Sequence, residues 1–103
     1  MIDEAADFLL RRGLSHFFGV LGGGVTLELA SRLKSGGATY IPSHFEGSAA
    51  IMAGTWGRIK NCPGICLCIK GPGVANLIPG LALANFEHLP LIAFAEAYDS
   101  LSS

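Results

Sequence analysis

Residues 64–76 read GICLCIKGPGVAN, and this stretch decides the fold. Residues 65–69 form an uninterrupted apolar run, without the polar alternation of a strand that has one face in water. Such runs are typical of strands buried on both faces of a parallel sheet. Gly71, Pro72 and Gly73 then break the run and open an apolar helix, which we expect over residues 74–86. The stretch therefore predicts a strand, a tight turn and a covering helix.

The alternation of strand and helix continues in both directions from this stretch. We expect helices over residues 3–12, 25–34 and 46–58, and strands over residues 15–20, 38–41 and 91–95. Pro42 is expected to end the second strand, and residues 98–103 to form no element. Strands that alternate with helices imply a mainly parallel sheet with right-handed crossovers. The sequence therefore predicts a three-layer α/β fold.

The composition is unusual for a chain of this size. The 103 residues leave room for one domain, and they are 50% hydrophobic and only 15% charged, whereas about 25% charged residues is usual. A small domain has much surface for its volume and needs polar residues to cover it. We therefore expect this chain to meet other protein mass or to be part of a larger molecule.

Charge and cysteine content exclude several classes of protein. The net charge is −1, with 7 basic and 8 acidic residues interspersed, so neither a nucleic-acid footprint nor a polybasic membrane patch is present. The apolar runs are too short for a membrane helix, and the acidic N-terminus lacks the charge pattern of a signal peptide. The 3 cysteines are clustered and odd in number, which does not suit a disulfide framework. A cytoplasmic location is the simplest expectation.

Three loops follow strand ends, at the edge of the sheet where open α/β folds bind ligands. They span residues 19–24, 42–46 and 70–73. Glu46 has small, apolar neighbours, which is unusual for a solvated carboxylate; an ordinary acid in the first turn of a helix is the alternative reading. His44 and His88 have no partners at ligand spacing, and the cysteines of the apolar strand are expected to be inert. No metal site is predicted.

The glycines of the first loop allow a second interpretation, a dinucleotide-binding Rossmann-like domain. Gly22, Gly23 and Gly24 follow the first strand, and Glu46 comes about 20 residues later, as an acid does in that fold. The glycine spacing is imperfect, because Leu27 stands where the motif needs its last glycine. A tight turn alone also accounts for the glycines.

Five segments in order resemble motifs of one family, the thiamine diphosphate-dependent enzymes grouped with acetolactate synthase, pyruvate oxidase and benzoylformate decarboxylase. Residues 18–23, FGVLGG, are similar to F-G-V-P-G-G, and residues 46–58, EGSAAIMAGTWGR, resemble E-x-x-A-A-x-M-A-D-G-Y-A-R. Residues 63–66, PGIC, match the family's strand entry, residues 71–77, GPGVANL, match G-P-G-A-T-N-L, and residues 89–93, LPLIA, match V-P-V-L-A. The resemblance is to the N-terminal pyrimidine-binding domain, which has a flavodoxin-like topology.

The resemblance implies a role for each matching residue. Glu46 is the glutamate that hydrogen-bonds the aminopyrimidine of thiamine diphosphate and promotes loss of its C2 proton, which creates the nucleophile for a 2-oxo acid. Gly71, Pro72, Gly73 and Asn76 would border the pyrimidine. Gly22 and Gly23 would lie at the mouth of the active site. The implied activity is that of a decarboxylase or an acetolactate synthase-like enzyme.

The chain also departs from the family pattern. Leu21 replaces a usual proline, Phe45 a frequent histidine and Lys70 a usual serine or threonine, while Glu96 and Ala97 replace Gly-Gln. These departures leave the substrate open. Nothing resembles the G-D-G…N motif that holds Mg²⁺ and the diphosphate, so residues 1–103 are expected to be a partial domain, inactive alone.

The resemblance also implies partners. These are a diphosphate-binding domain or subunit, absent from this chain, which carries the Mg²⁺, and a second copy of the chain in a homodimer or homotetramer. A third interpretation is a non-catalytic assembly module, which the high apolar content would suit.

Overall fold

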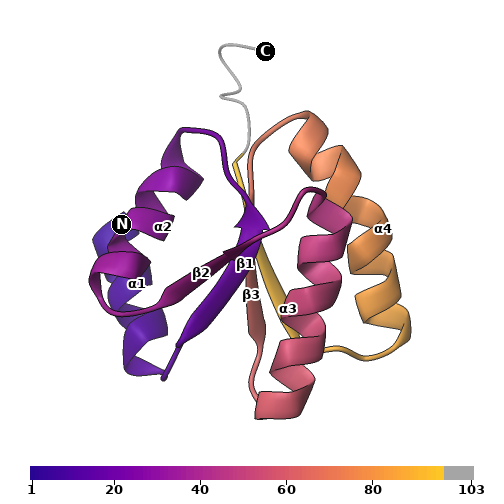
Figure 1. Cartoon of the computed structure of the whole chain (residues 1–103), viewed down its shortest axis with the longest axis horizontal. Helices are drawn as coiled ribbons and strands as arrows, with labels where there is room; N and C mark the ends of the chain where they lie inside the picture. The colour runs from indigo at the N-terminus through magenta and orange to yellow at the C-terminus, as the bar shows by residue number, and fades with distance from the viewer. Residues whose placement is uncertain (97–103) are drawn as a thin grey trace.

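The computed structural model describes residues 1–96 as an alternation of helices and strands (Figure 1). In chain order the elements are α1 (Ile2–Arg11), β1 (His16–Val20), α2 (Val25–Ser35), β2 (Thr39–Pro42), α3 (Glu46–Lys60), β3 (Gly64–Cys68), α4 (Pro72–Phe86) and β4 (Leu91–Ala95). Every expected element is present. The expectation for residues 98–103 lies outside the described residues.

The strands form one 4-stranded sheet in the order β2-β1-β3-β4. All three pairings are parallel, with Phe18 opposite both Ile41 and Cys66 in the register. The chain first adds a strand on one side of β1 and then returns to add β3 and β4 on the other. The order therefore reverses between β1 and β3, which is the switch point of a flavodoxin-like sheet. The α/β class and this topology are confirmed.

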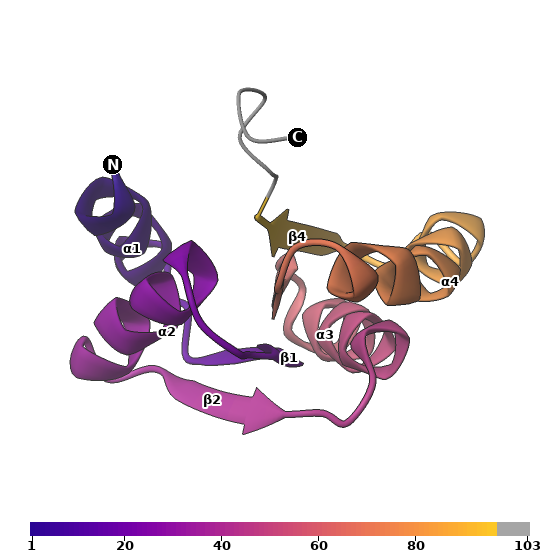
Figure 2. The same cartoon turned by 90° about the horizontal axis from the view of Figure 1, so that it is seen from above.

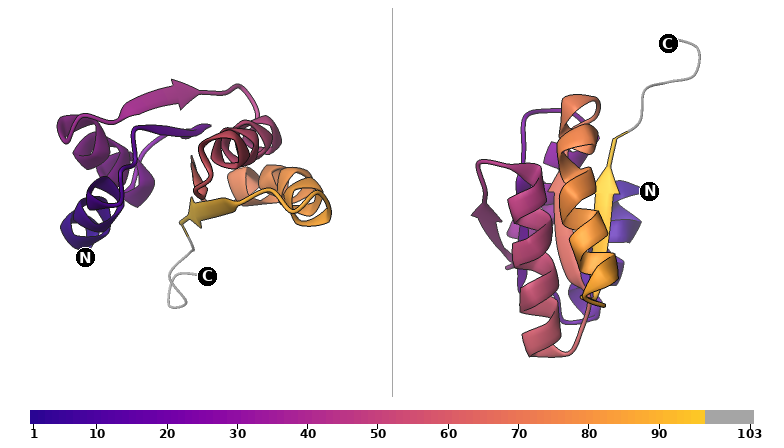
Figure 3. Two further views of the ribbon diagram at one scale, coloured as in Figure 1. Left: turned by 90° about the horizontal axis from the view of Figure 1, so that it is seen from below. Right: turned by 90° about the vertical axis from the view of Figure 1, so that its right-hand side faces the viewer.

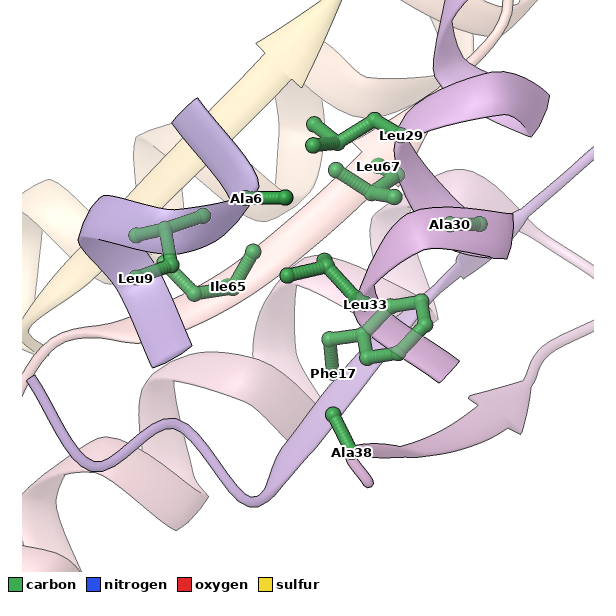
Figure 4. Packing of buried hydrophobic residues seen from close by; sticks show 9 residues of the cluster. All are labelled: Ala6, Leu9, Phe17, Leu29, Ala30, Leu33, Ala38, Ile65 and Leu67. Carbon is green, nitrogen blue, oxygen red and sulfur yellow. The ribbon is translucent and has the colours of Figure 1, made fainter. Parts of the chain in front are cut away.

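Helices cover both faces of the sheet. Figures 2 and 3 show α1 and α2 on one face and α3 and α4 on the other. Each face has its own core, because successive strand residues point to opposite sides. Phe17, Ile65 and Leu67 pack under α1 and α2 (Figure 4), whereas Phe18, Cys66 and Cys68 pack under α3 and α4. β3 is thus buried on both faces over Gly64–Cys68, as its composition predicts, whereas Ile69 follows the strand and is half-buried.

Several element boundaries differ by one or two residues from the sequence-based expectation, and two of these differences have a clear physical reason. Pro42 lies within β2 and pairs with Gly19 instead of ending the strand. An edge strand tolerates proline because only one of its sides must donate hydrogen bonds. Gly64 begins β3 rather than belonging to the preceding turn, and its N–H donates to the Pro90 carbonyl at 2.9 Å. Within residues 1–96, no helix is both long enough and apolar enough to cross a membrane.

Candidate functional site

Glu46 is the first residue of α3 and is buried, with 6% of its surface exposed. The chain leaves β2 at the carboxyl edge of the sheet. Phe45, which has an extended backbone, then directly precedes the first residue of α3. The first turn of a helix favours a carboxylate, because the unpaired backbone N–H groups there carry partial positive charge. A neighbouring set of small residues, Gly47, Ala49 and Ala50, lets this helix end pack closely. The site therefore holds an acid away from water at the edge where ligands bind.

The carboxylate of Glu46 faces the start of α4. A Cβ atom on Gly73 would lie 3.2 Å from Glu46 Oε2 and 2.9 Å from Ile69 Cγ1. Any side chain at position 73 would therefore crowd the acid. Gly71, with a φ of 74°, precedes α4, and Pro72 opens it. A carboxylate, a bare backbone segment and the positive end of a second helix meet at this point.

The thiols of β3 lie on the same face of the sheet as this acid. Burial raises the pKa of Cys66 to about 12, with smaller contributions from the neighbouring charges of Cys68 and Glu46. Burial and the Glu46 charge likewise raise the pKa of Cys68. Both thiols therefore stay protonated at neutral pH and are poor nucleophiles and metal ligands. Among the described residues no cluster of three metal-binding side chains occurs.

The other predicted residues have different neighbours. A Cβ on Gly22 would contact Ile69 Cγ2 at 3.4 Å, whereas one on Gly23 would meet nothing within 4 Å. The Asn76 carbonyl oxygen lies 3.2 Å from the Cβ position of Gly47, while the Asn76 residue itself is exposed. The structure thus places the Glu46 carboxylate beside Gly73, with no room for a side chain at that position, and places Gly22 on the other side of Ile69.

Sequence reasoning missed Ile69 as part of this arrangement. Its side chain lies between the Cβ positions of Gly22 and Gly73 and so separates the loop after β1 from the turn before α4. Its place at the end of an apolar strand was visible in the sequence. Its position between two glycines was not, because that depends on how both loops pack.

Glu96 was also missed as a structural partner. Its Oε1 accepts hydrogen bonds from the backbone N–H groups of Val25 and, at 3.2 Å, Thr26. The N-terminus of α2 is where a Rossmann-like domain binds a pyrophosphate. A carboxylate of the chain itself occupies those donors, which argues against the dinucleotide interpretation.

A cavity of about 590 Å³ lies beside Glu96, between α1, α2 and the end of β4. Its walls include Ile2, Leu29 and Phe94, and Glu46 is not among its lining residues. This cavity lies on the opposite side of the sheet from the Glu46 site.

A buried carboxylate facing a bare glycine turn, at the carboxyl edge of a doubly wound parallel sheet, is typical of a ligand-binding α/β domain. Residues 3–102 match the family described as thiamine pyrophosphate enzyme, N-terminal TPP binding domain. The chain belongs to this family.

Individual relatives agree with the family match. The chain is 37% identical to acetolactate synthase of Bacillus subtilis (strain 168) over 89 residues, which are 86% of this chain and 15% of the relative. It is 38% identical over 95 residues to catabolic acetolactate synthase of Raoultella terrigena, covering 92% of this chain and 17% of the relative. It is 36% identical over 94 residues to 2-hydroxyacyl-CoA lyase of Arabidopsis thaliana, covering 91% of this chain and 16% of the relative. The chain thus spans a small part of the length of these relatives.

Proposed function

We propose that this chain supplies the aminopyrimidine-binding side of the active site in a thiamine diphosphate-dependent enzyme that acts on a 2-oxo acid. The observation that carries the proposal is the buried Glu46 carboxylate, which faces the glycine turn at the start of α4. Family membership and the acetolactate synthase relatives support the cofactor and the class of substrate. Glu46 is the residue to which we assign cofactor activation.

The residues around Glu46 suit a flat aminopyrimidine. A planar ring needs close approach to backbone, and the Gly73 position has no room for a Cβ between Ile69 and the carboxylate. Gly71, Pro72 and Gly73 would line one side of the ring, and Asn76, one turn further along α4, would border it. Gly22 and Gly23 would flank the entrance, on the far side of Ile69.

Glu46 would hold a proton at a ring nitrogen of the pyrimidine. Thiamine diphosphate, when bound, supplies the carbon nucleophile that attacks the 2-oxo acid. A carboxylate removed from water makes a stronger hydrogen bond to that nitrogen, because the surrounding dielectric is low. Cys66 and Cys68 stay neutral beneath it, so they neither compete for the proton nor add a charge.

The diphosphate and the Mg²⁺ would be held by another domain or subunit. The aligned part of the first relative is only 15% of its length, which leaves room for a further domain in proteins of this family. We propose that residues 1–103 act as one portion of the catalytic unit, in the cytoplasm, together with a diphosphate-binding partner. A homodimer or homotetramer would complete the assembly.

Replacing Glu46 tests the proposal. In the protein assembled with its diphosphate-binding partner, Glu46→Gln should reduce thiamine diphosphate-dependent turnover of a 2-oxo acid by about 10²- to 10⁴-fold, as expected when a proton-transferring group is lost. Glu28→Gln is the matched control, because Glu28 is an exposed first-turn acid on α2. Unchanged turnover in Glu46→Gln would remove the assignment.

Titration with two cofactors separates the alternatives. Tight binding of NAD and none of thiamine diphosphate would favour a dinucleotide-binding domain. Binding of neither, in an assembly that is intact, would favour a non-catalytic assembly module.

A further inference from the structure

The N-terminus of α2 is capped by a residue distant in the sequence. Gly24 precedes the helix and offers no side-chain cap, and its φ of 80° favours glycine. The carboxylate of Glu96, directly after β4, fills the space beside Gly24. It accepts the N–H groups of Val25 and Thr26, which are separated from it by 71 and 70 positions. The contact therefore joins the end of β4 to the loop after β1.

This capping contact fixes the loop that carries Gly22 and Gly23. The first N–H groups of a helix have no partner inside the helix, so a charged acceptor there stabilises the helix start and the residues just before it. The loop is anchored on its other side by β1, which is paired on both sides within the sheet. Glu96 thus fixes the end of the loop that leads into α2.

Ile69 is a neighbour that the loop and the glycine turn share on the side of Glu46. A Cβ added to Gly22 would lie 3.4 Å from Ile69 Cγ2, and one added to Gly73 would lie 2.9 Å from Ile69 Cγ1 and 3.2 Å from Glu46 Oε2. The space beside both glycines is therefore bounded by the same isoleucine. A shift of the loop gives Ile69 freedom to move toward or away from Gly73.

We propose that Glu96 is a positioning residue for the cofactor site. Its carboxylate holds the start of α2, the start of α2 holds the glycine loop against Ile69, and Ile69 sets the space beside Gly73 and Glu46. This inference rests on the proposed function, and it adds a residue that touches neither cofactor nor substrate.

The surroundings of Glu96 allow the carboxylate to be replaced from solution. The 590 Å³ cavity is lined by Gly24, Thr26 and Glu96, so a small anion has a path to the helix N-terminus. The Thr26 hydroxyl is buried and, within residues 1–96, has no hydrogen-bond partner, which leaves a further polar group at the same place. Formate is small enough to take the position of the missing carboxylate.

The test uses Glu96→Gly in the protein assembled with its diphosphate-binding partner. Loss of the cap should weaken thiamine diphosphate binding by about 2- to 30-fold, the range for a coupling carried through neighbouring contacts. The turnover at saturating cofactor should fall by a smaller factor than the affinity for the cofactor. Sodium formate should restore the affinity, whereas sodium chloride at equal ionic strength should not. Glu96→Gln, which retains one acceptor oxygen, should lose less affinity than Glu96→Gly.

The controls separate this inference from the proposed function. Glu28→Gln should bind the cofactor as the unmodified protein does. Amide hydrogen exchange at Val25 and Thr26 should accelerate in Glu96→Gly and slow again with formate, independently of any cofactor.

Cofactor affinity that is equal in Glu96→Gly and the unmodified protein would overturn the positioning role alone. Absence of cofactor binding in the unmodified protein would overturn both. If Glu96→Gly does not fold, the test rests on Glu96→Gln. An affinity of Glu96→Gln for thiamine diphosphate equal to that of the unmodified protein would then contradict the inference.

Discussion

At the scale of single residues, Cys66 and Cys68 set a measurable property of the folded chain. Burial raises the pKa of Cys66 from an ordinary value of 9.0 to about 12, and burial raises that of Cys68 as well. In the unfolded chain these thiols ionise above pH 9, while in the folded chain they stay protonated. The unfolded state therefore releases its protons first as the pH rises.

We predict that the chain loses stability in alkali because of these thiols. The contribution of Cys66 is fully present below pH 9 and is lost between pH 9 and about 12, with a slope of up to about 1.4 kcal/mol per pH unit. Cys68, whose pKa is also raised, adds a loss of the same sign above pH 9. Urea unfolding at a series of pH values measures it. A double Cys66→Ala, Cys68→Ala variant should show a flatter dependence.

The exposed thiol supplies the control for this prediction. Cys62→Ala should leave the slope unchanged, because Cys62 is exposed. Tyr40, whose pKa burial also raises, adds a slope of the same sign that should persist in every variant. An equal slope in the double variant and the unmodified chain would contradict the prediction.

At the scale of elements, the contact between α3 and α4 is close because of small residues. A Cβ on Gly80 would lie 2.5 Å from the Gly47 carbonyl oxygen and 2.8 Å from Ala50 Cβ. The two helices could not approach this closely with larger residues there. Since Glu46 lies on α3 and Gly73 on α4, this packing also sets the distance between the carboxylate and the glycine turn.

Gly80→Ala should therefore destabilise the chain, although alanine favours helix by about 1 kcal/mol over glycine. We expect a net loss of about 1–3 kcal/mol in the free energy of unfolding, as for an overpacked core. Urea unfolding measures it. Ala82→Gly, at an exposed position of the same helix, measures the difference in helix propensity between alanine and glycine without a change in core packing. A more stable Gly80→Ala variant would show that the helices can move apart without cost.

The elements and the candidate site differ in how well the sequence predicts them. The strand over residues 91–95 and the helix start at Val25 follow from local composition, and the structure has them at those positions. The glycine turn before α4 was also evident. The contact of Ile69 with both glycine loops depends on the rotation of α4 over the sheet, and the Glu96 cap spans 71 positions. Local patterns carry no information on either, because both arise from how distant elements pack.

At the scale of the whole molecule, α4 explains the low charge of the chain. It buries only Gly73, Leu77, Gly80 and Ala84, and it carries no charged residue. Its outer surface therefore offers apolar side chains to the surroundings, including Val74, Ile78, Leu81, Leu83 and Phe86. Exposed apolar side chains gathered on one element are typical of protein–protein contact sites. We propose that a second copy of the chain covers this helix.

A double Ile78→Ser, Phe86→Ser variant tests this proposal. These side chains are 59% and 79% exposed, so their loss should barely change the stability of the monomer. We expect the variant to sediment with a smaller mean mass than the unmodified chain at equal concentration. Ile59→Ser is the matched control, because Ile59 is 75% exposed but lies on α3. Equal masses for the double variant and the unmodified chain would contradict a role of α4 in association.

The two edge strands of the described sheet differ in how readily they accept a further strand. The β2 edge contains Pro42, which cannot donate a hydrogen bond to an incoming strand. The β4 edge is entirely apolar, from Leu91 to Ala95, and within residues 1–96 it has a neighbour only on the β3 side. An apolar edge strand with unpaired backbone groups is a template on which a further strand can pair. Among the described residues, β4 is therefore the edge at which the sheet can be extended, whereas Pro42 makes β2 the less receptive edge.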